Sequence, residues 1–489
     1  MARHIRELIG TTAIYSAGTL LTQFVSFLLL PLYTRYLTPA DYGVLSLVVV
    51  VQSLLVVFSD LSITSGVFRF YHSTDEGPER RRLLATGFGS VLLTAGLTVA
   101  AVQLFADPLA DLAFDFRGGG PLLRIASASC FAITLGTMLQ RVLQLHRRPF
   151  LYMVVSFAQF LITVGTTVWL VVGEGAGVRG VLLGQLTGVS VTALVALVVL
   201  GPVLRAGMDG ARWRQLLAFS LPLVPTALAA MVIAASDRFF LERLSTLHEV
   251  GMYSVADKMA QVLQVLVIVP FSMSWNELAF RNQSDPELPR TFARTFRLYA
   301  VGMSTVIVLF TLVIRNLLSL ATTPEFVPAW VVVPLLAVAP LAQGFSMILY
   351  TGIHLSGRTR AIPLIFLVGM TLNLALNWAL IPSLGMLGAA IATALSVTVN
   401  VALTLRVSRQ AWPVDYPVGA ALRAVAAAMI ALGAYVALES DAWGPSIALR
   451  LACLGGFLGL LRLFGVVRVG EVIALWRRVR AAWTHRRRG

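Results

Sequence analysis

Charged residues are scarce in this sequence. Only 12% of the 489 residues are charged, 57% are hydrophobic and the mean hydropathy is +0.82, whereas soluble domains carry roughly 25% charged residues. The scarcity of charge therefore argues against an ordinary soluble protein. Apolar stretches recur along the whole chain, and about 20 such residues in a helix cross a hydrocarbon core roughly 30 Å thick.

Cysteine and histidine are also rare. Cys130 and Cys453 lie far apart inside apolar stretches, so they indicate neither a disulfide framework nor a metal site. The six histidines are scattered without metal-ligand spacing, and no glycine-rich phosphate-binding loop follows a strand pattern. The connections between the apolar stretches are too short for a catalytic domain. We therefore expect no enzymatic activity, no cofactor and no resident metal.

Lysine is nearly absent, although basic residues outnumber acidic ones. The chain has 38 basic and 23 acidic residues and a net charge of +15, and Lys258 is the single lysine. The arginines lie between the apolar stretches rather than in one patch, which argues against binding to nucleic acid.

The apolar windows predict an all-α polytopic membrane protein with about fourteen transmembrane helices. The first stretch is long and shows no convincing cleavage site, so we interpret it as a retained helix rather than a signal peptide. The predicted spans are 11–33, 43–66, 83–105, 121–143, 150–173, 180–201, 216–238, 251–275, 297–320, 327–350, 361–381, 385–405, 418–438 and 446–466.

Arginine alternates between successive connections. Cytoplasmic connections of membrane proteins keep an excess of arginine and lysine, and here every second connection is rich in arginine while the others hold mainly acids. Because one miscounted span would scramble this pattern, it supports fourteen helices with both ends in the cytoplasm. The arginines assigned to the cytoplasmic side are Arg3, Arg6, Arg80, Arg81, Arg82, Arg141, Arg147, Arg148, Arg205, Arg212, Arg214, Arg281, Arg290, Arg294, Arg297, Arg358, Arg360, Arg406 and Arg409.

The sequence also contains a weak internal repeat. Three short segments align with later ones at an offset of 208 or 210 residues, which is harder to dismiss than any single match. Each unit would hold six helices, an even number, so both would enter the membrane in the same sense with a cavity between them. The aligned segments are Arg35–Gly43 with Arg243–Gly251, Gly177–Gly180 with Gly385–Gly388, and Val142–Arg148 with Gly352–Arg358.

The repeat and the spans together predict the domain organisation. We expect an N-lobe at 1–205 with helices one to six and a C-lobe at 206–410 with helices seven to twelve, related as a parallel pseudo-repeat. Two extra helices follow at 411–466. The segment 467–489 has the pattern of a basic amphipathic helix on the cytoplasmic side, lying against anionic lipid or serving only as a topology anchor.

The same segments carry a family resemblance. LPLYTRYLTPADYGVLSL at Leu30–Leu47 resembles the start of polysaccharide exporters in the multidrug/oligosaccharidyl-lipid/polysaccharide superfamily. Phe219–Gln261 is similar to the middle signature of O-antigen and teichoic-acid flippases: a proline-containing span, Asp-Arg at its outer end, then Gly-x-Tyr-x-x-Ala. Pro334–Arg360 and Gly385–Ser396 extend the match. The resemblance covers about residues 8–410.

The resemblance implies a transporter of the bacterial inner membrane. It implies two six-helix lobes that alternate access and carry an undecaprenyl-pyrophosphate-linked oligosaccharide from the inner to the outer leaflet for surface polysaccharide assembly, without catalytic chemistry. The implied partners are this lipid-linked glycan, membrane lipids and, as an open question, the polysaccharide assembly machinery.

Ionisable residues inside the membrane are the candidates for function, because each costs about 3 kcal/mol on insertion scales. They include Arg124 and Glu277. A pyrophosphate headgroup needs cationic donors, and the arginine fork suits phosphate oxygens. The predicted substrate-binding residues are Arg35, Arg69, Arg141, Arg238 and Lys258, and the predicted coupling residues are Asp60, Asp237 and Asp257.

Each candidate also has a structural interpretation. Arg238, Lys258 and Arg35 could anchor a gate or interface by pairing with Asp237, Asp257 or Asp41. Side chains such as Arg69 and Arg141, near the cytoplasmic helix ends, often only snorkel to the interface. For Asp60, a hydrogen bond within the fold is the alternative to titration in a proton-coupled cycle.

Two other functions remain open at this point. A drug or cation antiporter of the same superfamily should present acids in an apolar cavity, whereas this chain offers charges of both signs, and the hairpin signatures favour glycan export. A membrane scaffold that transports nothing would leave the intramembrane charges and the repeat without a purpose.

The arginine alternation makes a topological prediction. Positions 76, 209 and 410 should face the cytoplasm, and positions 112 and 441 should face outward. Single cysteines at these positions, in a chain without Cys130 and Cys453, can be labelled from one side of the membrane with an impermeant maleimide. Labelling of position 112 from the cytoplasmic side would show that a span has been miscounted.

Overall fold

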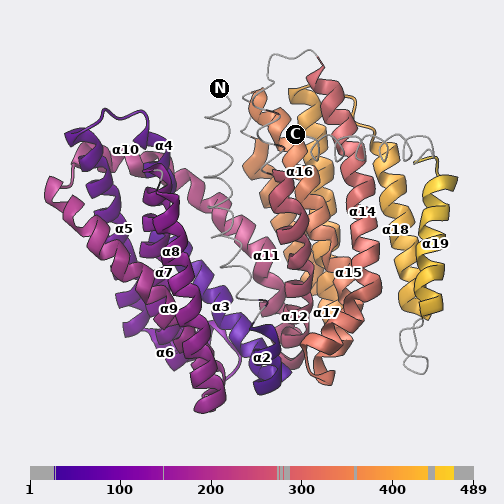
Figure 1. Cartoon of the computed structure of the whole chain (residues 1–489), viewed down its shortest axis with the longest axis horizontal. Helices are drawn as coiled ribbons and strands as arrows, with labels where there is room; N and C mark the ends of the chain where they lie inside the picture. The colour runs from indigo at the N-terminus through magenta and orange to yellow at the C-terminus, as the bar shows by residue number, and fades with distance from the viewer. Residues whose placement is uncertain are drawn as a thin grey trace, which may run out of the picture. The chain divides into compact units, whose positions relative to one another are not determined.

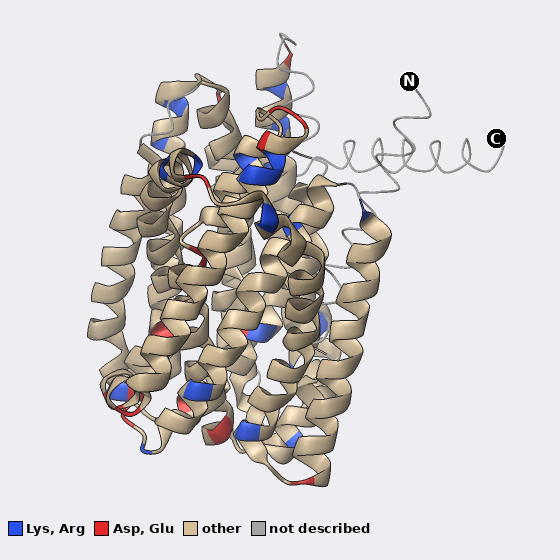
Figure 2. Cartoon of the chain, turned by 90° about the vertical axis from the view of Figure 1, so that its left-hand side faces the viewer, with Lys and Arg blue, Asp and Glu red and all other residues tan. Residues whose placement is uncertain are grey.

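A computed structural model of the chain describes residues 27, 29–146, 148–272, 275, 279, 287–356, 361–438 and 447–466. Within these residues the secondary structure is entirely helical, with no β-strand, which confirms the predicted all-α fold class. Helices suit a lipid environment because each satisfies its own main-chain hydrogen bonds. Figure 2 shows Lys, Arg, Asp and Glu mainly toward the helix ends, with long uncharged stretches between them.

Eleven helical segments in the described part of the chain are long and apolar enough to cross a membrane. Some of them join several elements end to end. The elements involved are α3 (Pro39–Asp60), α5 (Pro78–Leu104), α7 (Gly119–Leu145), α8 (Pro149–Val168) with η1 (Trp169–Gly173), α9 (Gly177–Leu200) with η2 (Gly201–Ala206), α10 (Gly210–Ser220) with η3 (Leu221–Leu223) and α11 (Val224–Leu244), α12 (Leu247–Leu263) with η4 (Gln264–Ile268), α14 (Leu288–Ala321), η5 (Pro324–Val332) with α15 (Val333–Leu336) and α16 (Val338–Leu355), α17 (Ile362–Ala411) and α18 (Val418–Leu438).

The count of fourteen spans stays a prediction. α17 contains a kink at Gly385, where φ is 54° and ψ is −131°, so this one candidate covers two predicted spans. The last predicted span corresponds to the shorter α19 (Ile447–Leu463). The first span lies mostly outside the described residues, and the tail at 467–489 and Glu277 lie wholly outside them.

The chain forms two compact units. The first consists of the described parts of Met1–Val255, Ala321–Phe326 and Phe366–Thr393, and the second of those of Ala256–Leu320, Val327–Ile365 and Ala394–Gly489. These units reflect packing and not internal symmetry, so the predicted lobes at 1–205 and 206–410 stay a prediction.

The core of the first unit lies among α5, α7, α8, α9 and the short helix α4 (Ile63–Tyr71), which Figure 1 shows side by side. Phe88, Leu135 and Met138 are almost fully buried there. α8 and α9 approach closely, because a Cβ atom at Gly184 or Gly188 would collide with a threonine of α8. Small residues allow such close packing of helices in lipid.

The second unit holds a layer of aromatic side chains. The ring centroids of Trp275 and Phe292 are 4.5 Å apart, and those of Phe292 and Trp412 are 4.7 Å apart. The indole N–H of Trp275 donates to the Thr351 hydroxyl at 3.0 Å. Tyr299 donates to the main-chain oxygen of Pro340 at 3.0 Å. The indole N–H of Trp275 and the hydroxyl of Tyr299 thus both have hydrogen-bond acceptors within the second unit.

The predicted span at 43–66 is wrong as one continuous helix. α3 ends at Asp60 and α4 begins after Leu61 and Ser62, whose φ angles of 45° and 59° are left-handed. This conformation costs roughly 1–2 kcal/mol per non-glycine residue. The Asp60 carboxylate compensates in part, because it accepts from the main-chain N–H of Thr64 at 3.4 Å and from the Thr64 hydroxyl.

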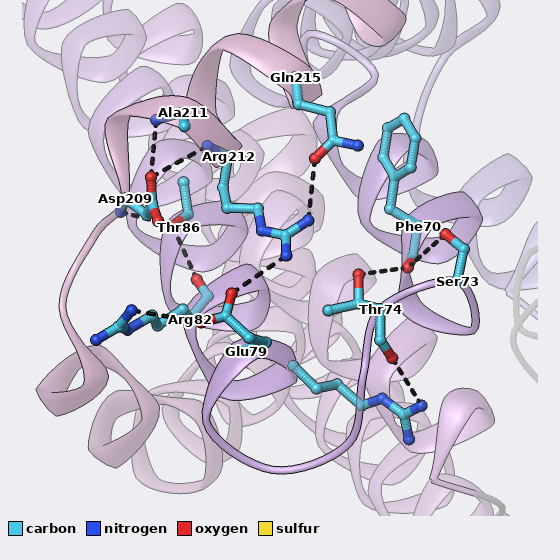
Figure 3. Close-up of polar contacts among 11 residues, drawn as sticks. Phe70, Ser73, Thr74, Glu79, Arg82, Thr86, Asp209, Ala211, Arg212 and Gln215 are labelled. Atoms are coloured by element: carbon cyan, nitrogen blue, oxygen red, sulfur yellow. Dashed lines mark hydrogen bonds and ion pairs between the residues drawn. The ribbon is translucent and has the colours of Figure 1, made fainter.

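A polar bridge joins α5 to α10 at the predicted cytoplasmic end of the first unit (Figure 3). Glu79 accepts from Arg212 at 3.2 Å and from Arg82 at 3.4 Å. The Thr86 hydroxyl accepts from the main-chain N–H of Asp209 at 3.0 Å. The ion pairs are half exposed, so we expect each to contribute at most about 1 kcal/mol; their role is to fix where α10 begins.

Asp209 is the N-cap of α10, and its Oδ1 accepts from the N–H groups of Ala211 at 2.7 Å and Arg212 at 3.3 Å. These two hydrogen bonds hold the pKa of Asp209 below its ordinary value. The cap therefore stabilises the fold above the unfolded-chain pKa of about 3.9, and its contribution is lost as the pH falls through the lower folded-state value.

We therefore expect Asp209→Ala to lower the thermal midpoint at neutral pH, and the difference from the wild type to shrink below about pH 4. Asp209→Asn is the matched control, since its amide oxygen can cap the helix without titrating. Thermal unfolding of the purified protein over a pH series measures both. An alanine effect that stays constant across the series would contradict the assignment.

Candidate functional site

A buried carboxylate lies near the C-terminal end of α11. Asp237 is only 2% exposed, and three side chains from other helices donate to it. The Thr393 hydroxyl donates to Oδ2 at 2.7 Å, the Asn377 amide donates to Oδ1 at 2.6 Å, and the Tyr253 hydroxyl also donates to Oδ2. The carboxylate thus joins α11, α12 and both halves of the kinked α17 within the first unit.

A second layer of polar groups surrounds these donors. The Asn373 side-chain oxygen accepts from Ser236 at 2.9 Å and from Asn377 at 3.1 Å, and the Asn373 amide donates to the Thr393 hydroxyl at 3.5 Å. The Asn377 side-chain oxygen is buried and has no hydrogen-bond partner in the described part of the chain. An orphaned acceptor in a buried network is costly and calls for an explanation.

We call this set the Asp237 cluster: Asp237 with Ser236, Tyr253, Asn373, Asn377 and Thr393. Its oxygens are those of one carboxylate and several neutral groups, so it is suited to binding one positive charge, either a proton or a small monovalent cation with hard oxygen ligands. Among the described residues, no cluster of three or more His, Cys, Asp or Glu side chains could hold a metal ion.

The predicted coupling residue Asp237 is thus placed in a built polar site. Sequence reasoning missed its partners because their side chains carry no charge. A signal was present in LNLALNW, where Asn373 and Asn377 are spaced by one helical turn inside an apolar span. Amides at such a depth are expensive in lipid and need a partner.

Arg238 lies beside the cluster. Its side chain is partly buried, its Nε donates to the Ser254 hydroxyl at 3.2 Å, and its guanidinium lies 5.9 Å from the ring centroid of Tyr253. Tyr253 therefore contacts both the Asp237 carboxylate and the Arg238 cation. The structure brings these two predicted residues into one site.

Asp257 and Lys258 belong to the part of α12 that lies in the second unit. Asp257 accepts from the Gln261 amide at 2.9 Å. Lys258 is partly buried, and among the described residues it makes no hydrogen bond or ion pair. The ion pair between Lys258 and Asp257 that the sequence left open is therefore not formed in this structure.

Arg69 and Arg141 are exposed and lie over aromatic rings. The guanidinium of Arg69 is 5.3 Å from the ring centroid of Phe219, and that of Arg141 is 5.9 Å from that of Phe68. Arg141 also donates to Gln144 at 3.3 Å. These contacts leave each guanidinium with donors for an anion, and they equally fit the snorkelling interpretation.

The remaining predicted residues have local roles in the structure. Asp60 caps the break between α3 and α4 through Thr64, as its structural alternative proposed. Arg35 is exposed in the last turn of α2 (Leu30–Tyr36). Asp41, considered as its partner, instead accepts from the N–H and hydroxyl of Thr38 at the N-terminus of α3. Neither Asp60 nor Arg35 shares the Asp237 cluster.

Comparison with known protein families shows to which family the chain belongs. Residues 9–275 match the family described as "Polysaccharide biosynthesis protein". The chain belongs to this family. The match covers more than half of the sequence and includes α11 and Asp237, and it confirms the family expected from the segments Leu30–Leu47 and Phe219–Gln261. No curated protein sequence matches the chain significantly.

Solved structures with the same fold are membrane transporters. "Lipid II flippase MurJ, inward closed conformation" matches with a TM-score of 0.71 and 15% identity, over 94% of this chain and 100% of the other. A multidrug resistance MATE family transporter of the MOP superfamily, inward-facing, gives 0.64 and 14%, over 80% and 94%. The Vibrio cholerae MATE transporter VcmN, in its bent form, gives 0.52 and 14%, over 83% and 98%. The chain is therefore a multi-pass membrane protein with a transporter fold.

The Asp237 cluster generates a stability prediction. Removing one donor from a buried carboxylate should cost about 1–3 kcal/mol, so Tyr253→Phe and Thr393→Val should each lower the thermal midpoint of the detergent-solubilised protein. Thr98→Val is the matched control, because the Thr98 hydroxyl only donates to the main-chain oxygen of Thr94 in its own helix. Midpoints of the two cluster variants equal to that of the control would show that Asp237 does not depend on these donors.

Proposed function

We propose that this protein moves undecaprenyl-pyrophosphate-linked oligosaccharide from the inner to the outer leaflet of the bacterial inner membrane by alternating access. The observation that carries the proposal is the family match at 9–275, on a fold shared with a lipid II flippase. Such a carrier provides a polar path through the membrane for a charged headgroup. It needs no bond chemistry, so we propose no enzymatic role.

Lys258 and Arg238 are the proposed headgroup contacts, with Arg35, Arg69 and Arg141 as further cations along the route. Lys258 is the stronger candidate because it is partly buried and makes no ion pair among the described residues. A cation held without a partner near lipid is costly unless water or an anion reaches it. A compact ammonium also releases phosphate more readily than a bidentate guanidinium, which suits a carrier.

Asp237 is the proposed coupling residue, and Asp257 and Asp60 are weaker candidates. Binding of a proton or monovalent cation would neutralise the buried charge and change the hydrogen bonds to Tyr253, Thr393 and Asn377. These donors come from different helices, so a change at the carboxylate alters how the helices are held together. The hydrogen-bonded cap at Asp60 gives that residue a sufficient structural role.

The second candidate function is a drug or cation antiporter of the same superfamily, favoured by the fold shared with MATE transporters. It predicts resistance to cationic drugs on overexpression and no defect in surface glycan. A deletion strain separates the two proposals. The flippase proposal expects lipid-linked repeat units to accumulate in the inner leaflet and surface polysaccharide to be lost. An unchanged distribution of lipid-linked units in that strain would refute it.

The headgroup proposal predicts the effect of single substitutions. Lys258→Ala should reduce glycan export at least tenfold at normal protein abundance, and Lys258→Arg should retain part of it. Arg423→Ala is the matched control, because Arg423 is exposed on α18 and its Nε donates to the main-chain oxygen of Gly419. Export is measured in the complemented deletion strain. Normal export by the Lys258→Ala variant would exclude Lys258 from the headgroup site.

A further inference from the structure

Two helix N-termini cross in very close contact in the first unit. A Cβ atom at Gly43 in α3 would collide with the main-chain oxygen of Leu247, and one at Gly251 in α12 would collide with that of Pro39. Each added Cβ would also lie 3.2 Å from the main-chain nitrogen of the other glycine. Only two residues without side chains allow this crossing.

The crossing is reciprocal. Leu247 precedes Gly251 by four residues, as Pro39 precedes Gly43, so each glycine packs on the first turn of the other helix. The helix starts also match, because Thr38 accepts from the N–H of Asp41 at 3.2 Å and Thr246 accepts from that of Glu249 at 3.2 Å. Equivalent turns therefore meet each other, as expected where a local two-fold axis passes between two repeats.

A second contact lies at the C-terminal end of α11. It joins α11 to the region of α6, which Figure 1 shows at the lower end of the first unit. Glu242 is 8% exposed and accepts from the main-chain N–H of Asp115 at 2.9 Å. Arg243 donates to the main-chain oxygen of Leu112 at 2.9 Å, and its Nε lies 3.8 Å from the Asp115 carboxylate. Two neighbouring side chains thus clamp the last turn of the short helix α6 (Ala106–Ala113) and Asp115, which follows it.

We propose that the Gly43–Gly251 crossing and the Glu242–Arg243 clamp form the outward gate of the transporter, a closed contact that separates when the cargo leaves toward the outer leaflet. The inference rests on the proposed function and deepens it. Both contacts join a residue of the predicted N-lobe to one of the predicted C-lobe, at the end where the arginine alternation places the outside.

The chemistry of these contacts suits a gate better than permanent packing. In the clamp the Glu242 carboxylate accepts from a main-chain N–H and the Arg243 guanidinium donates to a main-chain oxygen, so the clamp can break without opening a hydrophobic core. The crossing is stable only at close approach, because glycines offer no side chains to hold a wider contact. The gate therefore has a closed state and a separated state, with little to stabilise positions between them.

The gate shares a helix with the coupling site. Glu242 follows Asp237 by five residues in α11, which is about 7.5 Å along the helix axis. Tyr253, a donor to Asp237, lies two residues after Gly251 in α12. A change in the bonds of the Asp237 cluster that shifts α11 against α12 would therefore act directly on both parts of the gate.

Spin labels at positions 111 and 248 test the gate, because Asp111 and His248 are both exposed; Asp111 precedes Leu112 of the clamp and His248 follows Leu247 of the crossing. In a chain carrying Cys130→Ser and Cys453→Ser, pulsed electron–electron double resonance should give a dominant short distance. Glu242→Ala and Gly43→Ala should each raise the long-distance population at least threefold. Glu242→Gln keeps a side-chain oxygen that can accept from the main-chain N–H of Asp115, so this variant should show the short distance of the wild type.

Gly96→Ala is the control, since a Cβ atom at Gly96 would meet nothing within 4 Å. The gate is refuted if Glu242→Ala and Gly43→Ala both leave the distance distribution as it is in this control. It is also refuted if Glu242→Gln opens the distribution as far as Glu242→Ala does. The gate and the cargo can fail separately. If these variants open the gate but deletion of the protein leaves the distribution of lipid-linked glycan unchanged, the gate stands and the proposed cargo is refuted.

Discussion

The contacts among α11, α12 and both halves of α17 depend on one buried carboxylate, that of Asp237. Placing the Asp237 charge away from water is expensive unless donors surround it, and the fold supplies three, from Tyr253, Asn377 and Thr393. Those donors come from α12 and from both sides of the kink at Gly385. Holding the charge therefore ties α11 to three other helical segments at once, which is why we propose coupling at Asp237 in preference to Asp60.

The lipid environment explains why such a site can control a large movement. Helices in lipid satisfy their own main chains, so few polar contacts between helices decide which packing is adopted. In the first unit these contacts gather along α11: first the Asp237 cluster, then Glu242 and Arg243, which bind the last turn of α6 and Asp115 after it. Because Asp237, Glu242 and Arg243 all lie on α11, a change in the charge of Asp237 can act on the proposed gate through this one helix.

The sequence predicted the helical class and the family, since apolar length and ordered motifs are strong signals, and it singled out Asp237 as a candidate because a charge in lipid is costly. It did not predict the break at Leu61–Ser62, because neither glycine nor proline occurs there and the Asp60–Thr64 cap appears only in three dimensions. It also missed Asn373 and Asn377, because an uncharged amide stands out less than a carboxylate. The roles of Arg69 and Arg141 could not be assigned from sequence, because their contacts with Phe219 and Phe68 depend on tertiary packing.

The most direct measurement uses purified protein in lipid vesicles with a fluorescent undecaprenyl-pyrophosphate-linked oligosaccharide in both leaflets. An impermeant reductant added outside bleaches only the label that reaches the outer leaflet. We expect that the wild type exposes nearly all of the label, that Asp237→Asn does so much more slowly, and that a fluorescent cationic drug is not transported. Label that stays protected in vesicles with the wild-type protein, together with transport of the cationic drug, would contradict a glycan flippase and favour the antiporter.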